Sequence, residues 1–282
     1  MYQTILNKIF TGNRQEAFDA ILEKYKKQWF CIVDYVYFAN IYGKKLFEHH
    51  KEHYVLSHFQ DALLEDYKKT NVSLVHKLYQ DALLDSDFAL MDGIALQLFY
   101  FLAKWKWLPN LNGTDFAPFV LESLVQKFGA HNVRMIIYGT YPHLLQKTKI
   151  YLQDKWYQVV YAQDGYTNLD RDQVEKVLSA EEWKINVMLV ARSTAVYPVQ
   201  EMRVYANKER IKKNKLWVMN QAGTFDWRVG EQKRPPMLVR KLRLEWLWRL
   251  VSDPKRNYKK VLDSLGILHY IFSYLLLKKR SR

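Results

Sequence analysis

The sequence predicts an α/β fold in which a Rossmann-like parallel sheet is flanked by helices. Apolar runs bounded by turn residues recur along the chain, and helical patterns separate them. Strands that alternate with helices pair in parallel. Apolar residues make up 49% of the chain and aromatic residues 15%, which is enough to fill a large core. The expected strands are Tyr54–Ser57, Phe88–Met91, Val133–Tyr138, Tyr157–Tyr161, Ile185–Ala191 and Leu216–Gln221.

Three regions are expected along the chain. Residues 1–53 form a divergent N-terminal region, in which the aromatic and histidine-rich segment Gln28–His53 fits an insertion or a small subdomain. Residues 54–234 form the α/β core, and residues 235–282 form a helical appendage. The expected helices are Glu16–Lys27, Val72–Leu84, Ile94–Leu102, Ala117–Phe128, Leu144–Asp154 and Val199–Lys213.

The chain carries a large excess of positive charge. It has 43 Lys and Arg against 29 Asp and Glu, a net charge of +14. This favours a polyanionic partner such as nucleic acid, an acidic membrane or a nucleotide diphosphate. The single cysteine, Cys31, excludes a disulfide framework and fits a reducing cytoplasm. The first residues, Met1–Phe10, lack the apolar region of a signal peptide.

A tract near the C-terminus has the outline of a site for a phosphorylated ligand. The turn Gly223–Asp226 follows an apolar strand and brings main-chain N–H groups and a carboxylate to a strand end. Pro235–Pro236 then begins a helix rich in arginine. Guanidinium groups are planar and permanently charged, so they suit phosphate.

The same helix has a simpler interpretation. Leu242, Trp246 and Leu250 recur at helical spacing, which predicts an inward-facing side. Arg249 stands four residues after Glu245, so it can equally form a local ion pair.

Asp92 and Gly93 follow the expected strand Phe88–Met91 and precede the helix that begins at Ile94. A carboxylate at a strand end, beside a glycine that lets a ligand approach, can act as a general base for a hydroxyl nucleophile. Aspartate is also a favoured helix N-cap, and local sequence alone favours that role.

Three further segments are expected at the carboxyl ends of strands or at helix starts, where α/β proteins bind their ligands. Asn112–Asp115 is a turn followed by a helix N-cap. Tyr138–Thr140 follows a strand and can accommodate phosphate or sugar. Pro198–Glu201 opens a helix and brings the amide of Gln200 to the same edge.

Two metal-binding patterns are interpreted as incidental. Asp85–Asp87 and Asp170–Asp172 have the Asp-x-Asp spacing that holds a divalent cation on a nucleotide diphosphate in many sugar transferases. The first string ends a helix, and Arg171 competes with a metal in the second. His49–His53 matches a zinc-peptidase pattern but lacks its structural context.

The C-terminal segment Leu265–Leu277 is almost wholly apolar and ends in the basic tail Lys278–Arg282. It is shorter than the roughly 20 residues that cross a bilayer. Two interpretations stay open: a helix in the interface of an anionic membrane, or a terminal helix docked on the core.

Together these motifs resemble the WecG/TagA/CpsF family of bacterial glycosyltransferases over roughly residues 54–256. The ordered series is harder to obtain by chance than any one member. It comprises Ser86–Asp87, Asp92–Ile94, Asn112–Asp115, Gly139, Gly165–Thr167, Pro198–Glu201, Ala222–Asp226, Gly230, Lys233–Pro236, Leu244–Leu250 and Asp253–Arg256.

The resemblance implies transfer of a sugar from a UDP-sugar, such as UDP-N-acetylmannosamine, to an undecaprenyl-diphosphate-linked saccharide, with inversion and without a metal or other cofactor. It implies that Asp92 is the base and that Arg249 and Arg256 neutralise the departing diphosphate. It also implies an appendage that brings the enzyme to the inner face of the cell membrane. The expected substrate-binding residues are Ser57, Gly93, Thr114, Asp115, Gly139, Gln200, Glu201, Gly223, Phe225, Asp226 and Arg234.

The chain departs from the family pattern at several positions. The family's Thr at the first strand end is at best Ser57, its Asn two residues on is Phe59, and the Arg before the Gly-x-Asp motif is Asn110. A family lysine is replaced by Val199. Two alternatives to the implied function therefore stay open. The donor can be UDP-glucose or another hexose donor, or the chain can be a catalytically weakened scaffold subunit of a polysaccharide assembly complex. Self-association is left open, and no nucleic-acid motif accompanies the charge.

Overall fold

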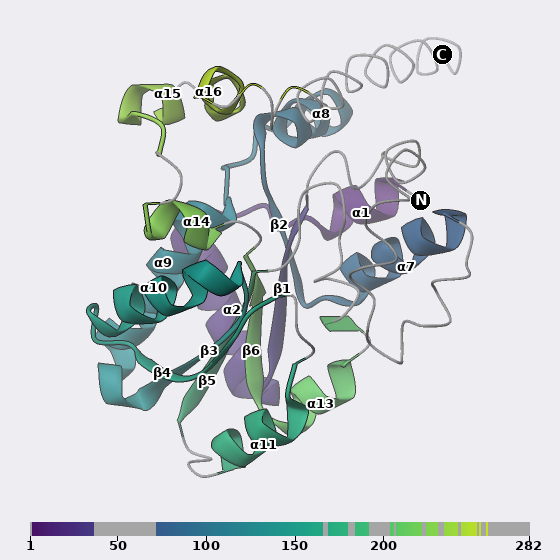
Figure 1. Ribbon diagram of the computed structural model, residues 1–282. Coiled ribbons are helices and arrows are strands. Elements are labelled where there is room, and N and C mark those ends of the chain that lie inside the picture. Colours follow the sequence, from purple (N-terminus) through teal and green to yellow (C-terminus); the bar gives the residue numbers. More distant parts are fainter. Residues whose placement is uncertain are drawn as a thin grey trace.

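The centre of the molecule is a six-stranded sheet in the order β2-β1-β6-β5-β3-β4 (Figure 1). The computed structural model describes residues 2–36, 72–165, 169–179, 184–191, 204–205, 207–221, 224–230, 234–241, 244–252, 254 and 258. All strand pairs are parallel, which confirms the predicted α/β class. The strands are β1 (Cys31–Val36), β2 (Phe88–Met91), β3 (Val133–Gly139), β4 (Gln158–Gln163), β5 (Ile185–Ala191) and β6 (Leu216–Asn220).

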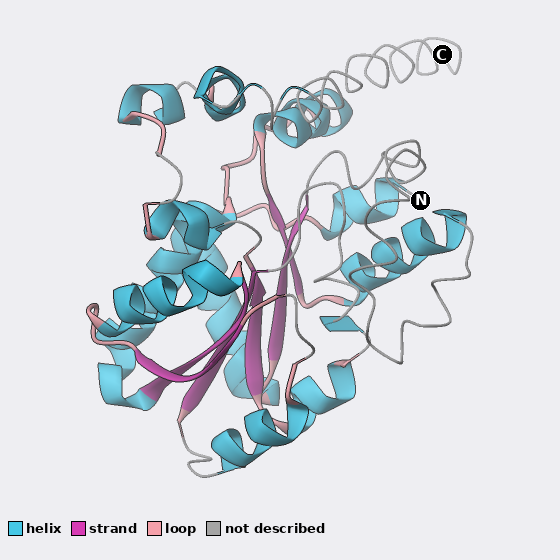
Figure 2. Ribbon diagram, in the orientation of Figure 1, coloured by secondary structure: helices cyan, strands magenta, loops and turns pink. Residues whose placement is uncertain are grey.

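Helices cover both faces of the sheet, so the fold has three layers (Figure 2). One face packs against α2 (Arg14–Gln28), α9 (Gly113–Phe128), α10 (Pro142–Gln153) and α14 (Thr224–Arg228). The opposite face packs against α1 (Tyr2–Lys8), α7 (Val72–Asp85), α11 (Arg171–Ser179) and α13 (Lys208–Lys213). Helix α8 (Ile94–Lys104) follows β2 and joins the cluster formed with α1 and α7.

The strands are apolar because both faces of the sheet are covered. All seven residues of β3 are buried, as is typical of parallel sheets packed between helices. On one face, Trp217 of β6 is fully buried. Its ring centroid lies 6.4 Å from that of Phe18 and 5.6 Å from that of Tyr25, both on α2. These aromatic contacts fix α2 against the middle of the sheet.

Most expected elements are confirmed. Strands β2 and β5 begin and end where the sequence predicts, and the other three predicted strands that are described differ only at their ends. The helix expected over Val199–Lys213 is described as α13 and residues 204–205. The expected strand Tyr54–Ser57 lies outside the described residues. Helices α1 and α11 were not predicted.

The N-terminal region is not separate from the sheet. Residues Cys31–Val36, interpreted from the sequence as part of an insertion or subdomain, form β1, which pairs with β2 on one side and β6 on the other. The interpretation is therefore wrong for these residues. The strand is difficult to recognise in the sequence, because the carboxylate of Asp34 interrupts the apolar run. In the structure Asp34 is buried and accepts a hydrogen bond from Asn220 Nδ2.

The C-terminal part differs from the single helix that was expected. Its described residues include two short helices, α15 (Met237–Lys241) after Pro236, and α16 (Glu245–Ser252). Of the predicted inward-facing residues, Trp246 is 41% exposed and Leu250 is half-buried, while Leu242 lies outside the described residues. Within the described residues, no helix combines the length and apolar character needed to cross a membrane.

Candidate functional site

The carboxyl ends of the strands all point to one edge of the sheet, since every pair is parallel. In Figure 1 this is the edge below α8, α15 and α16. Here β2 is followed by Asp92, β3 by Thr140 and β6 by Gln221. Asp92 and Thr140, which the sequence singled out, therefore lie at the same edge of the sheet, where open α/β sheets bind ligands, and the strands β1, β6 and β5 separate them.

Asp92 stands at the junction of β2 and β1. Its main-chain N–H donates to the carbonyl of Val36 at 3.1 Å, and its side chain is half-buried. The N-cap residue of α8 is Gly93, with φ 91°, and not Asp92. The helix-cap role favoured by the local sequence is therefore wrong. Gly93 matters because a positive φ of this kind is strained for residues with a side chain.

Asn110 holds the turn that contains Asp92. Its Oδ1 accepts from the N–H of Gly93 at 3.3 Å, and the next residue, Leu111, donates its N–H to the carbonyl of Met91 at 3.1 Å. The loop before α9 therefore runs along the end of β2. The sequence pointed to Asn110 only as a departure from the family pattern, whereas the structure gives it a part in shaping the turn.

A buried polar group lies beside Asp92. Gln221 Nε2 donates to the hydroxyl of Tyr35 at 3.4 Å, and Gln221 Oε1 has no hydrogen-bond partner among the described residues. Burial raises the pKa of Tyr35 well above its usual range, and the negative charges of Asp92 and Asp34 raise it further. The Tyr35 hydroxyl and the Gln221 amide are thus a neutral pair, and the negative charge of Asp92 raises the pKa of that hydroxyl. Sequence reasoning missed Tyr35, because it lies in the strand that was not predicted.

The start of α9 packs against this pair. A Cβ on Gly113 would lie 3.3 Å from the Tyr35 ring and 3.5 Å from Gln221 Oε1, so a glycine fits the close approach. Asn112 caps the helix by accepting from the N–H of Asp115 at 2.9 Å. Thr114 contributes its carbonyl, which accepts from the Arg228 guanidinium at 2.8 Å.

Asp115 and Arg234, both expected to bind substrate, pair with each other. The Asp115 carboxylate accepts a hydrogen bond from the Arg234 guanidinium and lies 3.5 Å from that of Arg240. Arg234 precedes α15 and Arg240 lies within it. In this structure the two pairs fasten α15 to the start of α9.

Gly139 and Thr140 form a tight turn at the end of β3. Gly139 has φ 130°, and a Cβ there would lie 2.3 Å from the carbonyl oxygen of Ala191 on β5, so only glycine fits. The N–H of Thr140 donates to the same carbonyl at 2.7 Å. Thr140 Oγ1 is buried and has no hydrogen-bond partner within the described part of the chain.

A comparison with protein families decides what kind of site this is. The model of the Glycosyl transferase WecG/TagA/CpsF family matches residues 44–282. The chain belongs to this family. It is therefore a glycosyltransferase of cell-wall polysaccharide synthesis, which uses a nucleotide-sugar donor and a lipid-linked acceptor. The match begins after β1, so a central strand of this transferase precedes the matched residues.

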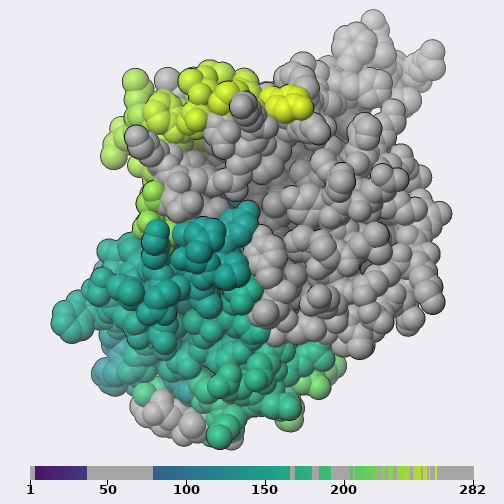
Figure 3. All heavy atoms as spheres, in the orientation of Figure 1, coloured from purple at the N-terminus to yellow at the C-terminus, as the bar shows by residue number. Residues whose placement is uncertain are grey.

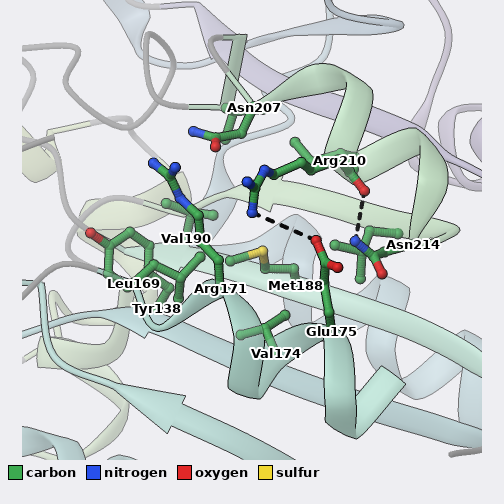
Figure 4. A pocket seen from close by; sticks show the side chains of 13 residues that line it. Tyr138, Leu169, Arg171, Val174, Glu175, Met188, Val190, Asn207, Arg210 and Asn214 are labelled. Atoms are coloured by element: carbon green, nitrogen blue, oxygen red, sulfur yellow. Dashed lines mark hydrogen bonds and ion pairs between the residues drawn. The ribbon is translucent and has the colours of Figure 1, made fainter. Parts of the chain in front are cut away.

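The glycosyltransferase has a hollow on the sheet face between α11 and α13, of about 640 Å³ including space open to solvent (Figure 4). Its floor is apolar, and its rim carries guanidinium and amide groups. Glu175 on α11 faces Arg210 and Lys213 on α13, at 3.6 and 3.4 Å. The described lining residues are Tyr138, Leu169, Arg171, Val174, Glu175, Met188, Val190, Val204, Asn207, Arg210, Ile211, Asn214 and Leu216.

The two Asp-x-Asp strings of the transferase have local roles, in line with their incidental interpretation. Asp85 pairs with Lys208 at 2.6 Å, and Asp87 accepts from the N–H of Ile32 at 2.9 Å. Asp170 accepts from the N–H of Gln173 at 3.0 Å at the start of α11. The zinc-peptidase pattern at 49–53 lies outside the described residues.

The remaining expected site residues are described only in part. Phe225 is buried in the core between the sheet and α9, and it also lines a hollow that residues of α9, α10 and α14 surround. Asp226 lies in α14 and Arg249 in α16, but only their main chains are described. The others, Ser57, Gln200, Glu201, Gly223 and Arg256, lie outside the described residues.

Proposed function

We propose that the chain transfers a sugar from a UDP-sugar, such as UDP-N-acetylmannosamine, to a hydroxyl of an undecaprenyl-diphosphate-linked saccharide, with inversion at C1 and without a metal. The product feeds teichoic acid or exopolysaccharide synthesis. The observation that carries the proposal is the position of Asp92: a half-buried carboxylate that directly follows β2, next to the cap residue Gly93 of α8.

In the proposed reaction Asp92 is the general base. It accepts the proton of the acceptor hydroxyl while that oxygen forms a bond to C1 of the sugar, and the bond from C1 to the UDP oxygen breaks with its electron pair on UDP. One displacement of this kind inverts the configuration at C1. The neutral Tyr35–Gln221 pair supports this role, because it adds no cation that would weaken Asp92 as a base.

Arginines take the place of a metal in this proposal. Charge develops on the diphosphate of the departing UDP, and a preorganised cation stabilises it. Arg249 on α16 and Arg256 beyond it are the proposed cations. Figure 1 supports this assignment, since α16 lies at the end of the molecule to which the strand ends point.

The donor is proposed to extend from Asp92 along the sheet edge towards β3. The Gly139–Thr140 turn suits phosphate or sugar, because the Thr140 hydroxyl has no hydrogen-bond partner among the described residues. We propose that the same edge binds the donor and the acceptor through further residues. These are Gly93, Thr114 and Asp226, together with Ser57, Gln200, Glu201 and Gly223. Asp115, Arg234 and Phe225 are proposed to act by supporting the edge, as their ion pair and burial indicate.

The test is UDP release and product analysis with a panel of UDP-sugars and a short-chain lipid-diphosphate acceptor. Asp92→Asn should lower kcat by roughly 100-fold or more, since a positioned base contributes that much. The matched control is Asp154→Asn, an exposed carboxylate at the end of α10, which should retain wild-type turnover.

Unchanged turnover of Asp92→Asn would rule out the base assignment. A preference for UDP-glucose or another hexose donor would revise the donor alone. Absence of turnover with every donor would favour the scaffold alternative, in which the chain organises an assembly complex.

The proposed location is the inner face of the bacterial cell membrane, where the lipid-linked acceptor would reside. The chain would bind there as a peripheral protein through residues 235–282. The apolar and basic composition of residues 265–282, which lie outside the described residues, supports this.

A further inference from the structure

The C-terminal end of α8 presents two tryptophans to solvent. Trp105 is 70% exposed and Trp107 is 45% exposed. Lys104 and Lys106 alternate with them and are also exposed. Aromatic side chains of this size are normally buried, so their exposure side by side between lysines is unusual for a surface that only faces water.

This segment, Lys104–Trp107, is held in place rather than loose. Trp105 is the C-cap of α8, with φ 54°, and its N–H donates to the carbonyl of Phe101 at 2.7 Å. The ring of Phe101 meets both tryptophans edge to face, at 5.7 and 5.8 Å.

The two ends of the segment are anchored as well. Lys104 Nζ donates to Asn7 Oδ1 at 2.9 Å, and Gln97 Nε2 donates to the carbonyl of the buried Leu108 at 2.7 Å. The fold therefore fixes both tryptophan rings at the surface.

The segment belongs to an end of the molecule that exposes other apolar side chains. Helices α8, α15 and α16 lie at the same end in Figure 1, and Figure 3 shows the side chains of α15 and α16 at the outer surface there. On α15, Met237 and Leu238 are 63% and 67% exposed, and Val251 on α16 is 73% exposed. A flat partner at this end could contact all three helices at once.

We propose that Lys104–Trp107 is a membrane contact of the core itself, which inserts its two tryptophans into the interface of an anionic bilayer and places its lysines on the head groups. Tryptophan favours the boundary between acyl chains and head groups, because its ring is apolar and its N–H is polar. Lysines near an anionic surface add attraction, and the net charge of +14 has the matching sign.

This contact would also orient the enzyme. Asp92 and Gly93 immediately precede α8, so a bilayer that touches the far end of α8 lies on the side of the strand ends. The orientation rests on the proposed function, because it brings Asp92 towards a lipid-linked acceptor. The lipid contact itself requires no substrate.

The test uses the full chain with Trp105→Cys, labelled with an environment-sensitive fluorophore. Cys31 is fully buried, so the new thiol is the reactive one. The matched control is Trp156→Cys: Trp156 is 82% exposed, also has a positive φ, and precedes β4 at the opposite edge of the sheet. With phosphatidylglycerol vesicles, the label at 105 should shift to the blue and the label at 156 should not.

Binding is measured in parallel by vesicle flotation. Trp105→Asn combined with Trp107→Ser should weaken binding on the order of tenfold, from the apolar surface lost. Replacing Lys104 and Lys106 by Gln should cost roughly fivefold each. Trp156→Asn should bind as the wild type does.

Three results would overturn the proposal. The first is a vesicle-bound chain whose label at 105 stays in water, and the second is an equal shift of the emission at 105 and 156. The third is a shift at 105 that depends on protein concentration without vesicles, which would indicate contact with a second copy. A transfer assay of the wild-type chain with a water-soluble acceptor separates the two proposals. If the wild-type chain transfers no sugar in this assay, the result counts against the proposed function. The vesicle result is unaffected, because it needs no substrate.

Discussion

Burial gives Asp34 a different acidity from that of a surface aspartate. It raises the pKa of Asp34 to about 7, against the opposing effect of the hydrogen bond from Asn220. Between about pH 4 and 7 the folded chain therefore holds a proton that the unfolded chain has released. Stability should fall as pH rises through this window, because the folded state then has to bury a charge.

Asp34→Asn should remove this pH dependence. The asparagine stays neutral and can still accept from Asn220 through its amide oxygen. The variant should gain stability relative to the wild type as pH rises from 5 to 8, as measured by urea unfolding at both values. The control is Asp19→Asn, an exposed carboxylate on α2. An equal pH dependence in Asp34→Asn and wild type would show that Asp34 is ionised in the folded chain at both values.

Asp92 shows why a single residue type does not reveal its role. Aspartate before a helix fits a cap as well as a base, and the sequence alone favoured the cap. The decision depends on where α8 begins. The helix begins one residue later than a cap at Asp92 requires, with Gly93 in the cap position at φ 91°.

Among the elements, α15 depends on a contact with a distant helix. It has five residues and no buried residue, so its own packing contributes little. The pairs of Arg234 and Arg240 with Asp115 connect it to α9. Since the groups are partly exposed, the pairs should contribute about 1 kcal/mol or less to global stability.

Asp115→Asn should therefore loosen α15 without unfolding the core. Hydrogen exchange at the amides of Met237–Lys241 should accelerate severalfold, while β3 exchanges as in the wild type. Glu175→Gln is the matched control, because it removes a carboxylate that faces two cations between α11 and α13. Unchanged exchange in α15 would show that other contacts hold the helix.

Local pattern predicted the elements well where they are continuous. The strands β2 and β5 are uninterrupted apolar runs between turns, and their ends were predicted correctly. Strand β1 was missed because its sequence includes Asp34 and lies in an aromatic segment without a clear turn. The C-terminal arginine helix was predicted as one unit, whereas its described residues form two helices, so helical spacing alone did not locate the break between them.

At the scale of the whole molecule, the N-terminal residues complete the sheet. The family match begins at residue 44, yet β1 pairs on both sides within the sheet and α2 packs Phe18 and Tyr25 against Trp217. The matched residues alone therefore lack the interior strand β1 and the covering helices α1 and α2.

A fragment of residues 44–282 should fail to fold. Without β1, the strands β2 and β6 each lose a neighbour and expose main-chain hydrogen-bonding groups. The fragment should show no cooperative thermal transition by circular dichroism, whereas the full chain should show one. Addition of a separate peptide of residues 1–43 should restore part of the signal. A fragment that unfolds cooperatively at the midpoint of the full chain would refute this expectation.

The sequence by itself determined the α/β class, the position of Asp92 after a strand, and a family resemblance that the family comparison confirmed. These depend on residues close together in the chain. Only the tertiary structure decided that Tyr35 meets Gln221 and that Asp115 meets Arg234, pairs separated by 186 and 119 residues. Such contacts depend on how strands are ordered and helices packed, and local pattern does not record that order.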